Sequence, residues 1–584
     1  TRSLCWKNEY DCTQKETTTI CGLSFTLLPT SINTSAPPFH PRRSTMFEDV
    51  VSAPVNATVS AFGRLGSECD TTLLVAAAVL AFGVATLGIR WLSGLQRGES
   101  TASKSRATTA QDEQPVRPLM IPHWIPWLGN ALELVRLGFG GLARKYRDTV
   151  DGAPFVSVLV AGKTMHIVVD PIVFPAIFRH GVDTLSALPL FEPLWGRMFG
   201  RELKTTKFID GPARKPFHFM MQHLLTSDDG LVRSNRRFQS STMGRVKLCM
   251  DQSADGVARF RLRDFTHKVI FNAVLQTIVS KSVFDDETCE SYWEFATSII
   301  TAAKGSDIKN ANKPAYEARE RIMAFLKSAS FQPSDYMLKR RAVFAENGFG
   351  EEEMVRDILI AIWSSATNFI PSMFWMLYYV CSSKDTVKHL RREIENIRSE
   401  RSADASAFDD TFTMDEVDKM HGMGSAFKEA IRMSEHTAIA REVMKDFTMD
   451  LKLKSERCSK YEMKKGDLLV MYHPILHHDE HVFQDPSEFQ WDRFLPDEST
   501  GKRKVFRTKN GDVILDPFRG FGGGAHNCPA RKFVTAAAKN FVASLIHQFD
   551  VEVEGTTEFD MTLDEFGILD PSDDVGLTIR PRQH

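Results

Sequence analysis

A glycine-rich loop that carries one cysteine and leads directly into a helix constrains this chain more than any other feature. The loop is Phe-Arg-Gly-Phe-Gly-Gly-Gly-Ala-His-Asn-Cys-Pro-Ala-Arg, residues 518–531. Glycines allow positive φ angles and close packing against a flat group, and apolar residues at helical spacing follow from Phe533 to Leu545. A helix N-terminus that faces the sulfur of Cys528 should lower its pKa and stabilise a thiolate. The alternative is a buried, inert cysteine.

The size and charge of the chain exclude several classes of protein. It has 584 residues, 43% of them hydrophobic, and a formal net charge of -2. A small binding module is therefore excluded, and the charge provides no general attraction to nucleic acid. Nine cysteines are scattered without a repeated CxxC spacing, which favours neither a disulfide scaffold nor a zinc site.

The N-terminal part contains one segment that predicts a membrane anchor. Residues 71–89 are 19 residues without a charge, about the length that crosses a roughly 30 Å hydrocarbon core as a helix. Arg90 and Arg97 follow it, so the positive-inside rule predicts a cytosolic domain on an endoplasmic reticulum membrane; a buried core helix is the alternative. Residues 1–45 are interpreted as a gene-model extension or a disordered leader, and residues 46–70 as a lumenal N-terminus.

Two further predictions concern the borders of the folded domain. Asn56-Ala57-Thr58 is an N-glycosylation acceptor pattern, which would be lumenal in this orientation. Residues 90–120 are interpreted as a polar linker that ends in several prolines, so the catalytic domain is predicted to span residues 121–584. Within it, residues 131–147 have helical spacing, and residues 155–169 predict a β-hairpin.

The rest of the domain is predicted to be mainly α-helical with small β-sheets. A second uncharged run extends from Ile358 up to, but not including, Lys384 and could be read as a membrane span. Polar residues in its middle would make that costly, so a long core helix is the better interpretation. Pro371 lacks a backbone N–H and should kink this helix beside Thr367 and Asn368.

The glycine loop resembles the signature of the cytochrome P-450 family, Phe-x-x-Gly-x-x-x-Cys-x-Gly/Ala. Phe521, Gly524, Cys528 and Ala530 are all in place. The resemblance implies haem b as cofactor, with the Cys528 thiolate as the axial ligand of the iron. His526 stands where the family commonly has a basic partner for a haem propionate.

Two more motifs of the family follow one another in the expected order. Glu429-Ala430-Ile431-Arg432 resembles its Glu-x-x-Arg pair, whose spacing places both charges on one helical face. Arg493, in a segment similar to Pro-Glu-Arg-Phe, would complete an interior triad with Glu429 and Arg432, since buried charges require mutual pairing. Arg441 resembles a second propionate contact, although it could equally be a surface residue.

Residues 115–584 carry the resemblance, and the core helix is most similar to the branch that contains cholesterol 7-alpha-hydroxylase and prostacyclin synthase. Its segment 362–375 carries the pattern Trp-x-x-x-x-Asn-x-x-Pro-x-x-Phe-Trp. Most family members place an acid and a threonine above the haem to relay protons, but Thr367 and Asn368 stand there here. Catalytic proton delivery would then depend on these two residues and water. The family's Trp-x-x-x-Arg haem contact is not evident near residues 218–225.

The resemblance implies a monooxygenase that oxidises an apolar steroid, terpenoid or other lipid-like molecule with dioxygen. Electrons would come from NADPH through a flavoprotein reductase on the same membrane. Basic residues between 502 and 509, with Arg531 and Lys532, could help to bind an acidic reductase, or could be a solvated loop. The alternatives are an isomerase or dehydratase that acts on a peroxide without a reductase, and a haem-binding lipid carrier without turnover.

Overall fold

The computed structural model describes residues 114–150, 153–401, 412–452, 460–560 and 566–582. The predicted leader, lumenal segment and membrane anchor, and Asn56, lie outside these residues. In the described part the chain is mainly helical, with four small sheets. The predicted class of fold, mainly α with small sheets, is therefore confirmed for this part of the chain.

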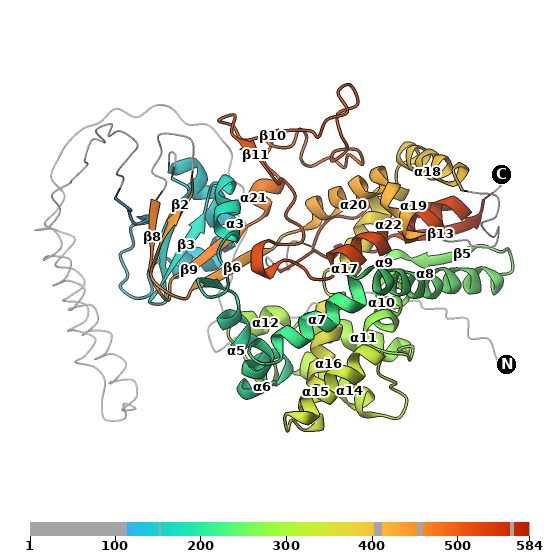
Figure 1. The fold of residues 1–584 in the computed structure, drawn as a ribbon, viewed down its shortest axis with the longest axis horizontal. Helices are drawn as coiled ribbons and strands as arrows, with labels where there is room; N and C mark the ends of the chain where they lie inside the picture. Colours follow the sequence, from blue (N-terminus) through green and yellow to red (C-terminus); the bar gives the residue numbers. More distant parts are fainter. Residues whose placement is uncertain (1–113, 151–152, 402–411, 453–459, 561–565, 583–584) are drawn as a thin grey trace, which may run out of the picture. The chain divides into compact units, whose positions relative to one another are not determined.

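The largest sheet joins segments that are far apart in the sequence. Its strand order is β1-β2-β3-β9-β6-β4, and β3 pairs in parallel with β9. Figure 1 shows the blue-to-teal strands β2 and β3 beside the orange strands β6 and β9. The strands are β1 (Leu119–Met120), β2 (Phe155–Val160), β3 (Lys163–Val168), β4 (Leu185–Ser186), β6 (Ala438–Val443) and β9 (Leu468–Tyr472).

The predicted hairpin is confirmed as β2 and β3. Its turn consists of Ala161 and Gly162, with φ angles of 49° and 80°, as a tight two-residue hairpin requires. The helix predicted for residues 131–147 is confirmed as α3 (Ala131–Thr149).

The border predicted between linker and domain is wrong at residues 116–120. Val116 forms a parallel bridge with Tyr461, and Leu119 in β1 pairs with Val156 in β2. Pro118 does not interrupt this edge, because its carbonyl accepts a hydrogen bond from the Ser157 hydroxyl at 3.3 Å. Prolines are tolerated on edge strands, where a missing N–H need not break the ladder.

Helices form most of the remaining core. The longer ones are α5 (Leu188–Phe199), α6 (Leu203–Asp210), α7 (Arg214–Leu225), α8 (Asp228–Asp251), α10 (Phe271–Ile278), α11 (Asp286–Ala296), α14 (Lys313–Lys327), α15 (Asp335–Glu346), α16 (Glu351–Ala366), α17 (Phe369–Cys381), α18 (Lys384–Ser399), α19 (Met414–Lys419), α20 (His421–Ser434) and α22 (Arg531–Gln548). Shorter ones are α4 (Phe174–Phe178), α9 (Leu262–Asp264), α12 (Ile299–Ala303), α13 (Ile308–Ala311) and α21 (Pro474–His477).

Three small sheets complete the described part. One has the order β12-β13-β5, and the others are the pairs β7-β8 and β10-β11. Their strands are β5 (Ala258–Arg261), β7 (Phe447–Asp450), β8 (Lys460–Met463), β10 (Phe506–Arg507), β11 (Val513–Ile514), β12 (Phe549–Glu554) and β13 (Gly576–Pro581).

The long apolar run is a kinked core helix, as predicted. By length and composition Glu351–Cys381 could cross a membrane, but 67% of its most apolar window is buried inside the fold. It divides into α16 and α17 at Thr367 and Asn368. Pro371 follows four residues after Thr367 and lacks the N–H that would continue the helical ladder to its carbonyl.

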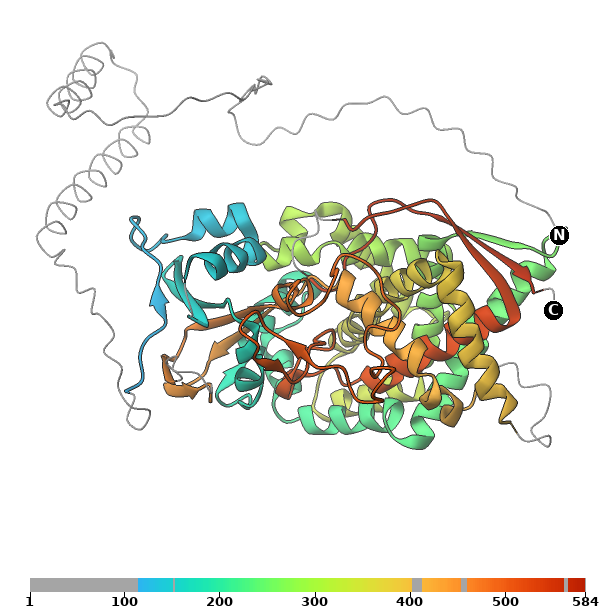
Figure 2. The same cartoon turned by 90° about the horizontal axis from the view of Figure 1, so that it is seen from above.

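Helix α22, which follows the glycine loop, lies in the centre of the helical part. It contacts α8, α18 and α20, and in Figure 2 it is the red helix among green and yellow neighbours. Its residues from Ala536 to Ile546 are all buried, so the loop before it is held by a fixed element of the core.

Candidate active site

The loop before α22 has the tight geometry that its glycines predict. The Cys528 N–H donates to the Phe521 carbonyl at 3.0 Å, and Gly522 and Gly524 have φ angles of 72° and 63°. A Cβ added to Gly523 would lie 2.5 Å from the ring of Phe178 in α4. Larger residues would therefore be strained or would displace α4.

Cys528 is half-buried, and the N–H groups of Ala530 and Arg531 point at its sulfur. Burial raises the pKa of the thiol, although these N–H groups and the Arg531 charge act in the opposite direction. The predicted lowering of the Cys528 pKa is therefore wrong for the thiol alone, because removal from water outweighs the helix terminus. A bound metal cation reverses this balance, since a coordinating thiol is deprotonated.

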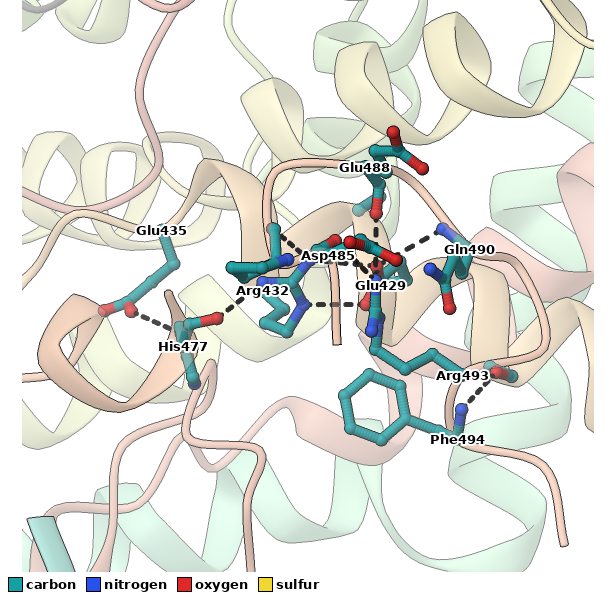
Figure 3. A network of polar contacts seen from close by, with 12 residues as sticks. Glu429, Arg432, Glu435, His477, Asp485, Glu488, Gln490, Arg493 and Phe494 are labelled. Atoms are coloured by element: carbon teal, nitrogen blue, oxygen red, sulfur yellow. Dashed lines mark hydrogen bonds and ion pairs between the residues drawn. The ribbon is translucent and has the colours of Figure 1, made fainter. Parts of the chain in front are cut away.

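Glu429, Arg432 and Arg493 form the predicted interior triad (Figure 3). Arg432 Nε lies 2.8 Å from Glu429 Oε2, and Arg493 Nε lies 2.7 Å from Glu429 Oε1. Glu429 and Arg432 are completely buried, and Arg493 is 5% exposed. One carboxylate thus shares its charge between two guanidinium groups that are shielded from solvent.

The guanidinium groups satisfy their other N–H groups on backbone carbonyls of the loops around them. The acceptors are His477 and Pro486 for Arg432, and Gln484, Asp485 and Glu488 for Arg493. Loss of one partner of a buried pair costs about 3–5 kcal/mol, because a charge is left uncompensated. The triad therefore fixes the segment from α21 to Phe494 that leads toward the glycine loop.

Arg441 in β6 is a buried cation without an acidic partner in the part of the chain that the structure describes. It is 7% exposed, and its only described hydrogen bond is from Nη1 to the Ala440 carbonyl at 2.9 Å. Burial lowers its pKa to about 10. Together with Phe178, Gly523 and His526 it lines one small pocket, so the surface alternative for Arg441 is wrong.

His526 adds a second basic group to this pocket. Burial, with the charges of Arg441 and Arg214, lowers the pKa of its imidazole to about 4. Its Nε2 accepts a hydrogen bond from the Ala187 N–H at 3.4 Å. Arg214 begins α7, and its charge acts on His526, so a second cation besides Arg441 lies near the site. It precedes residues 218–225, where the family's haem contact was expected.

The predicted catalytic residues lie at the break between α16 and α17. The Thr367 hydroxyl donates to the Trp363 carbonyl at 2.7 Å and lies 3.3 Å from the hydroxyl of Tyr292. Asn368 is exposed, and its Oδ1 accepts a hydrogen bond from the Ile568 N–H at 3.2 Å. The amide oxygen of Asn368 therefore anchors the C-terminal loop, a contact between distant segments that the sequence could not indicate.

A buried histidine pair beside the triad was not predicted either. His473 Nδ1 and His477 Nδ1 lie 3.3 Å and 3.2 Å from the two oxygens of Glu435. Burial alone would raise the pKa of Glu435, but the two histidines lower it well below its ordinary value. Figure 3 shows Glu435 and His477 next to Arg432. The only signal in the sequence was an acid three residues after Arg432.

The comparisons with known proteins agree with this geometry. The family model "Cytochrome P-450" matches residues 306–579. Among curated relatives, cytochrome P-450 7B1 of Mus musculus is 23% identical over 473 residues, which cover 76% of this chain and 86% of the relative. The chain belongs to the cytochrome P-450 family.

Other relatives of this P-450 point to the same branch. The 25-hydroxycholesterol 7-alpha-hydroxylase of Rattus norvegicus is 30% identical over 261 residues, which cover 44% of this chain and 61% of the relative. That match thus spans less than two thirds of the relative's length. Prostacyclin synthase of Rattus norvegicus is 22% identical over 485 residues, which cover 78% of this chain and 92% of the relative. The P-450 is therefore an enzyme of the oxidoreductase family, and these relatives belong to the predicted branch.

The residues of this P-450 fit the haem-thiolate cofactor that the family implies. Cys528 offers a sulfur that receives backbone N–H groups, as an axial ligand does. Arg441 is a buried cation that lacks a counter-charge among the described residues, and His526 lies beside it. Two haem propionates would supply the anions that these residues lack. Phe521 and Gly524, the other predicted cofactor contacts, lie in the same loop.

Proposed function

We propose that this P-450 is a monooxygenase that inserts one oxygen atom of dioxygen into an apolar lipid of the steroid or terpenoid type. Electrons would come from NADPH through a flavoprotein reductase. The observations that carry the proposal are the cysteine ligand directly before α22 and the polar break at Thr367 and Asn368 in an interior helix, where Asn368 is exposed. The names of two relatives, a 25-hydroxycholesterol hydroxylase and a cholesterol monooxygenase, support this substrate class.

Each residue of the site has a distinct role in the proposed reaction. Haem b, when bound at Cys528, supplies the dioxygen chemistry. Arg441 and His526 hold its propionates and so fix its orientation. The amide of Asn368 orients water beside the helix break, where no carboxylate stands at residue 367 or 368.

The ligand assignment has a spectroscopic test. The reduced, carbon-monoxide-bound protein should absorb at the position typical of thiolate-ligated haem. Cys528→His should lose this band even where haem is retained, whereas Cys289→Ser, a change at a buried cysteine elsewhere in the fold, should keep it. An unchanged band in the Cys528 variant would refute the assignment. Shifts of the ferric band with added steroids and terpenoids would then identify ligands.

The second candidate is an isomerase or dehydratase that acts on a peroxide, and two observations favour it. Prostacyclin synthase matches over most of its length, and the helix break lacks the acid that assists oxygen activation. Such an enzyme needs neither NADPH nor dioxygen. Anaerobic turnover of a hydroperoxide or endoperoxide, with no incorporation of labelled dioxygen under any condition, would replace the first proposal. Ligand-stimulated NADPH consumption would exclude both this candidate and a non-catalytic carrier.

We also propose that the P-450 is anchored in the endoplasmic reticulum membrane with a cytosolic catalytic domain. The apolar run at residues 71–89 supports this. So do large apolar side chains that are exposed near the start of the described part: Trp124, Trp127, Leu132 and Val135. Glycosylation at Asn56 together with digestion of the domain by protease outside sealed microsomes is expected; protection of the domain would contradict the proposal.

The proposed reductase partner requires a positive surface near the cofactor ligand. Arg531 and Lys532 are exposed at the start of α22, directly after the loop of Cys528. Opposite charges accelerate association and lose effect as salt rises. Arg531→Glu with Lys532→Glu should raise the KM for the reductase, whereas Lys309→Glu with Lys313→Glu, a change of equal charge on α13 and α14, should not. Equal KM values for both variants would remove this face as the docking site.

A further inference from the structure

The polar side chains at the break between α16 and α17 divide between two faces. Ser364 and Asn368 are exposed, Thr367 is half-buried, and Ile362 and Ala366 are buried. Residues four positions apart lie one above the other on a helix, so Ser364 and Asn368 share the open face. Thr367 is turned toward the neighbouring helix α11.

Two bonds hold the hydroxyl of Thr367 on that buried side. It donates to the Trp363 carbonyl at 2.7 Å, and the hydroxyl of Tyr292 lies 3.3 Å from it. A threonine hydroxyl has one proton, so Tyr292 must be the donor in the second contact. Tyr292 is completely buried, and burial raises the pKa of its phenol. The threonine therefore has no proton left to offer to a ligand.

The hydroxyl of Ser364 is held less firmly than that of Thr367. Its hydroxyl makes one long hydrogen bond, 3.2 Å to the Ala361 carbonyl, and is free to rotate toward the open side. One turn further on, Asn368 uses its Oδ1 for the Ile568 N–H, and its NH2 group has no described partner. Two polar groups with unused hydrogen-bonding capacity thus stand next to each other on the open face.

The helix break that carries this face packs against the helix that follows the cofactor ligand Cys528. Phe369, the residue after Asn368, packs against Phe533 at 6.4 Å between ring centroids, and Phe533 is five residues after Cys528. On the other side, Gly567 lies so close to Asn368 that an added Cβ would be 2.2 Å from its Oδ1. The helix break that carries the open face thus packs against α22, the helix that follows Cys528, and against the C-terminal loop.

We propose that Ser364, with the Asn368 amide beside it, is the hydroxyl that delivers protons into the substrate pocket, and that Tyr292 holds Thr367 out of this role. In each step Ser364 donates its proton to a pocket water while its oxygen accepts a proton from the next water, so the hydroxyl is regenerated. The NH2 group of Asn368 orients that water. This inference rests on the proposed monooxygenase function.

The matched variants Ser364→Ala and Thr367→Val each remove one hydroxyl, and the two positions are about one helical turn apart. Both are made in the full-length, haem-loaded protein. The first measurement is the ferric absorption spectrum without substrate, which reports on water beside the cofactor and needs no electrons. Ser364→Ala should shift the band, and Thr367→Val should leave it near the wild-type position. Ser364→Thr, which keeps a hydroxyl, should restore it. A shift in Thr367→Val alone, or in neither variant, would overturn the proposal.

The second measurement is hydrogen peroxide released per NADPH consumed, with a flavoprotein reductase and 25-hydroxycholesterol as the probe. We expect at least a roughly threefold rise for Ser364→Ala and a smaller change for Thr367→Val, because slower proton delivery lets reduced oxygen escape. The reverse order would contradict the inference. Failure of the proposed monooxygenase function would give a different result, because the wild-type protein would then consume no NADPH with the reductase. The ferric spectra, which need no electrons, would still show whether Ser364 contacts the water beside the cofactor.

Discussion

The imidazole of His477 accepts a hydrogen bond from the backbone N–H of Arg519 at 3.0 Å, where the glycine loop begins. The carbonyl of His477 accepts from Arg432 of the buried triad at 2.5 Å. Since Nε2 is the acceptor, Nδ1 carries the proton and faces Glu435 at 3.2 Å. One residue thus connects the triad with the loop of the cysteine ligand.

His477→Phe should therefore weaken both the fold and the retention of haem. Phenylalanine can keep the stacking on Phe518, but it leaves the Arg519 N–H and one oxygen of Glu435 without a partner, at a cost of about 1–3 kcal/mol. Urea unfolding and the haem content of purified protein measure the two effects. His481→Phe, at a side chain that is 40% exposed, is the control; equal stability of the two variants would contradict the role of His477.

Arg441→Leu should have opposite effects on the two forms of the protein. Without haem, the buried cation lacks a described counter-charge and costs desolvation energy, so the apo variant should be at least as stable as wild type. With haem, a charged hydrogen bond to a propionate is lost, and haem affinity should fall by roughly tenfold or more. Haem titration and urea unfolding of apo protein test this, with Arg441→Lys as the charge-preserving control. Unchanged affinity in Arg441→Leu would remove the propionate assignment.

The stability of the helical part should depend on pH through Asp357 in α16. Its carboxylate is buried and lies 2.7 Å from Arg201 and 2.8 Å from Arg340. Burial alone would raise the pKa of Asp357, but Arg340 and Arg201 lower it below its ordinary value of 3.8. The stabilisation of the fold by the ionised Asp357 is therefore fully present above pH 3.8 and is lost as the pH falls through the lower folded-state pKa.

Asp357→Asn should cost about 3–5 kcal/mol at neutral pH, because it leaves two buried arginines uncompensated. The difference from wild type should shrink as the pH falls below 3.8, because the carboxylate of the unfolded chain is then protonated, and it should vanish once the pH has passed the lower folded-state pKa. Urea unfolding at a series of pH values measures it, and Asp251→Asn, at an exposed residue, should show no such trend. A difference that is constant with pH would refute the charge argument.

Asn368→Leu should release the C-terminal loop from the helix break. The variant cannot accept the hydrogen bond from the Ile568 N–H, so hydrogen exchange at Ile568 should become faster. Asn368→Asp keeps an acceptor oxygen and should keep that amide protected. Asn368→Leu should also raise the peroxide released per NADPH, since its amide no longer orients water. Unchanged exchange in the leucine variant would show that the loop is held by other contacts.

Local spacing was enough to predict much of this site. Glu429 and Arg432 are three residues apart on one helix, and the glycines before Cys528 are neighbours in the sequence, so a motif shows them directly. Pro371 likewise predicted the break in the core helix. Each of these features depends on covalent neighbours or on one turn of helix, which the sequence encodes without reference to the rest of the chain.

Contacts between distant segments could not be predicted in this way. The bonds from Ile568 to Asn368 and from Arg519 to His477 join residues that no periodicity relates. The pKa of Cys528 was misjudged for the same reason, because its sign depends on how far the surrounding chain removes the sulfur from water. The pairing of residues 116–120 with the sheet also required the position of β2 and Tyr461.

The close contact of Gly523 and Gly524 with Phe178 also determines when the cofactor pocket can assemble during synthesis. Phe178 is made early, whereas the two glycines leave the ribosome after more than half of the chain has followed it. Arg441 contributes from a third segment between them. Because the ligand Cys528 and both glycines lie in one late segment, nascent chains that lack the glycine loop cannot yet hold haem. Cofactor supply thus becomes useful to this protein only after the glycine loop has been made.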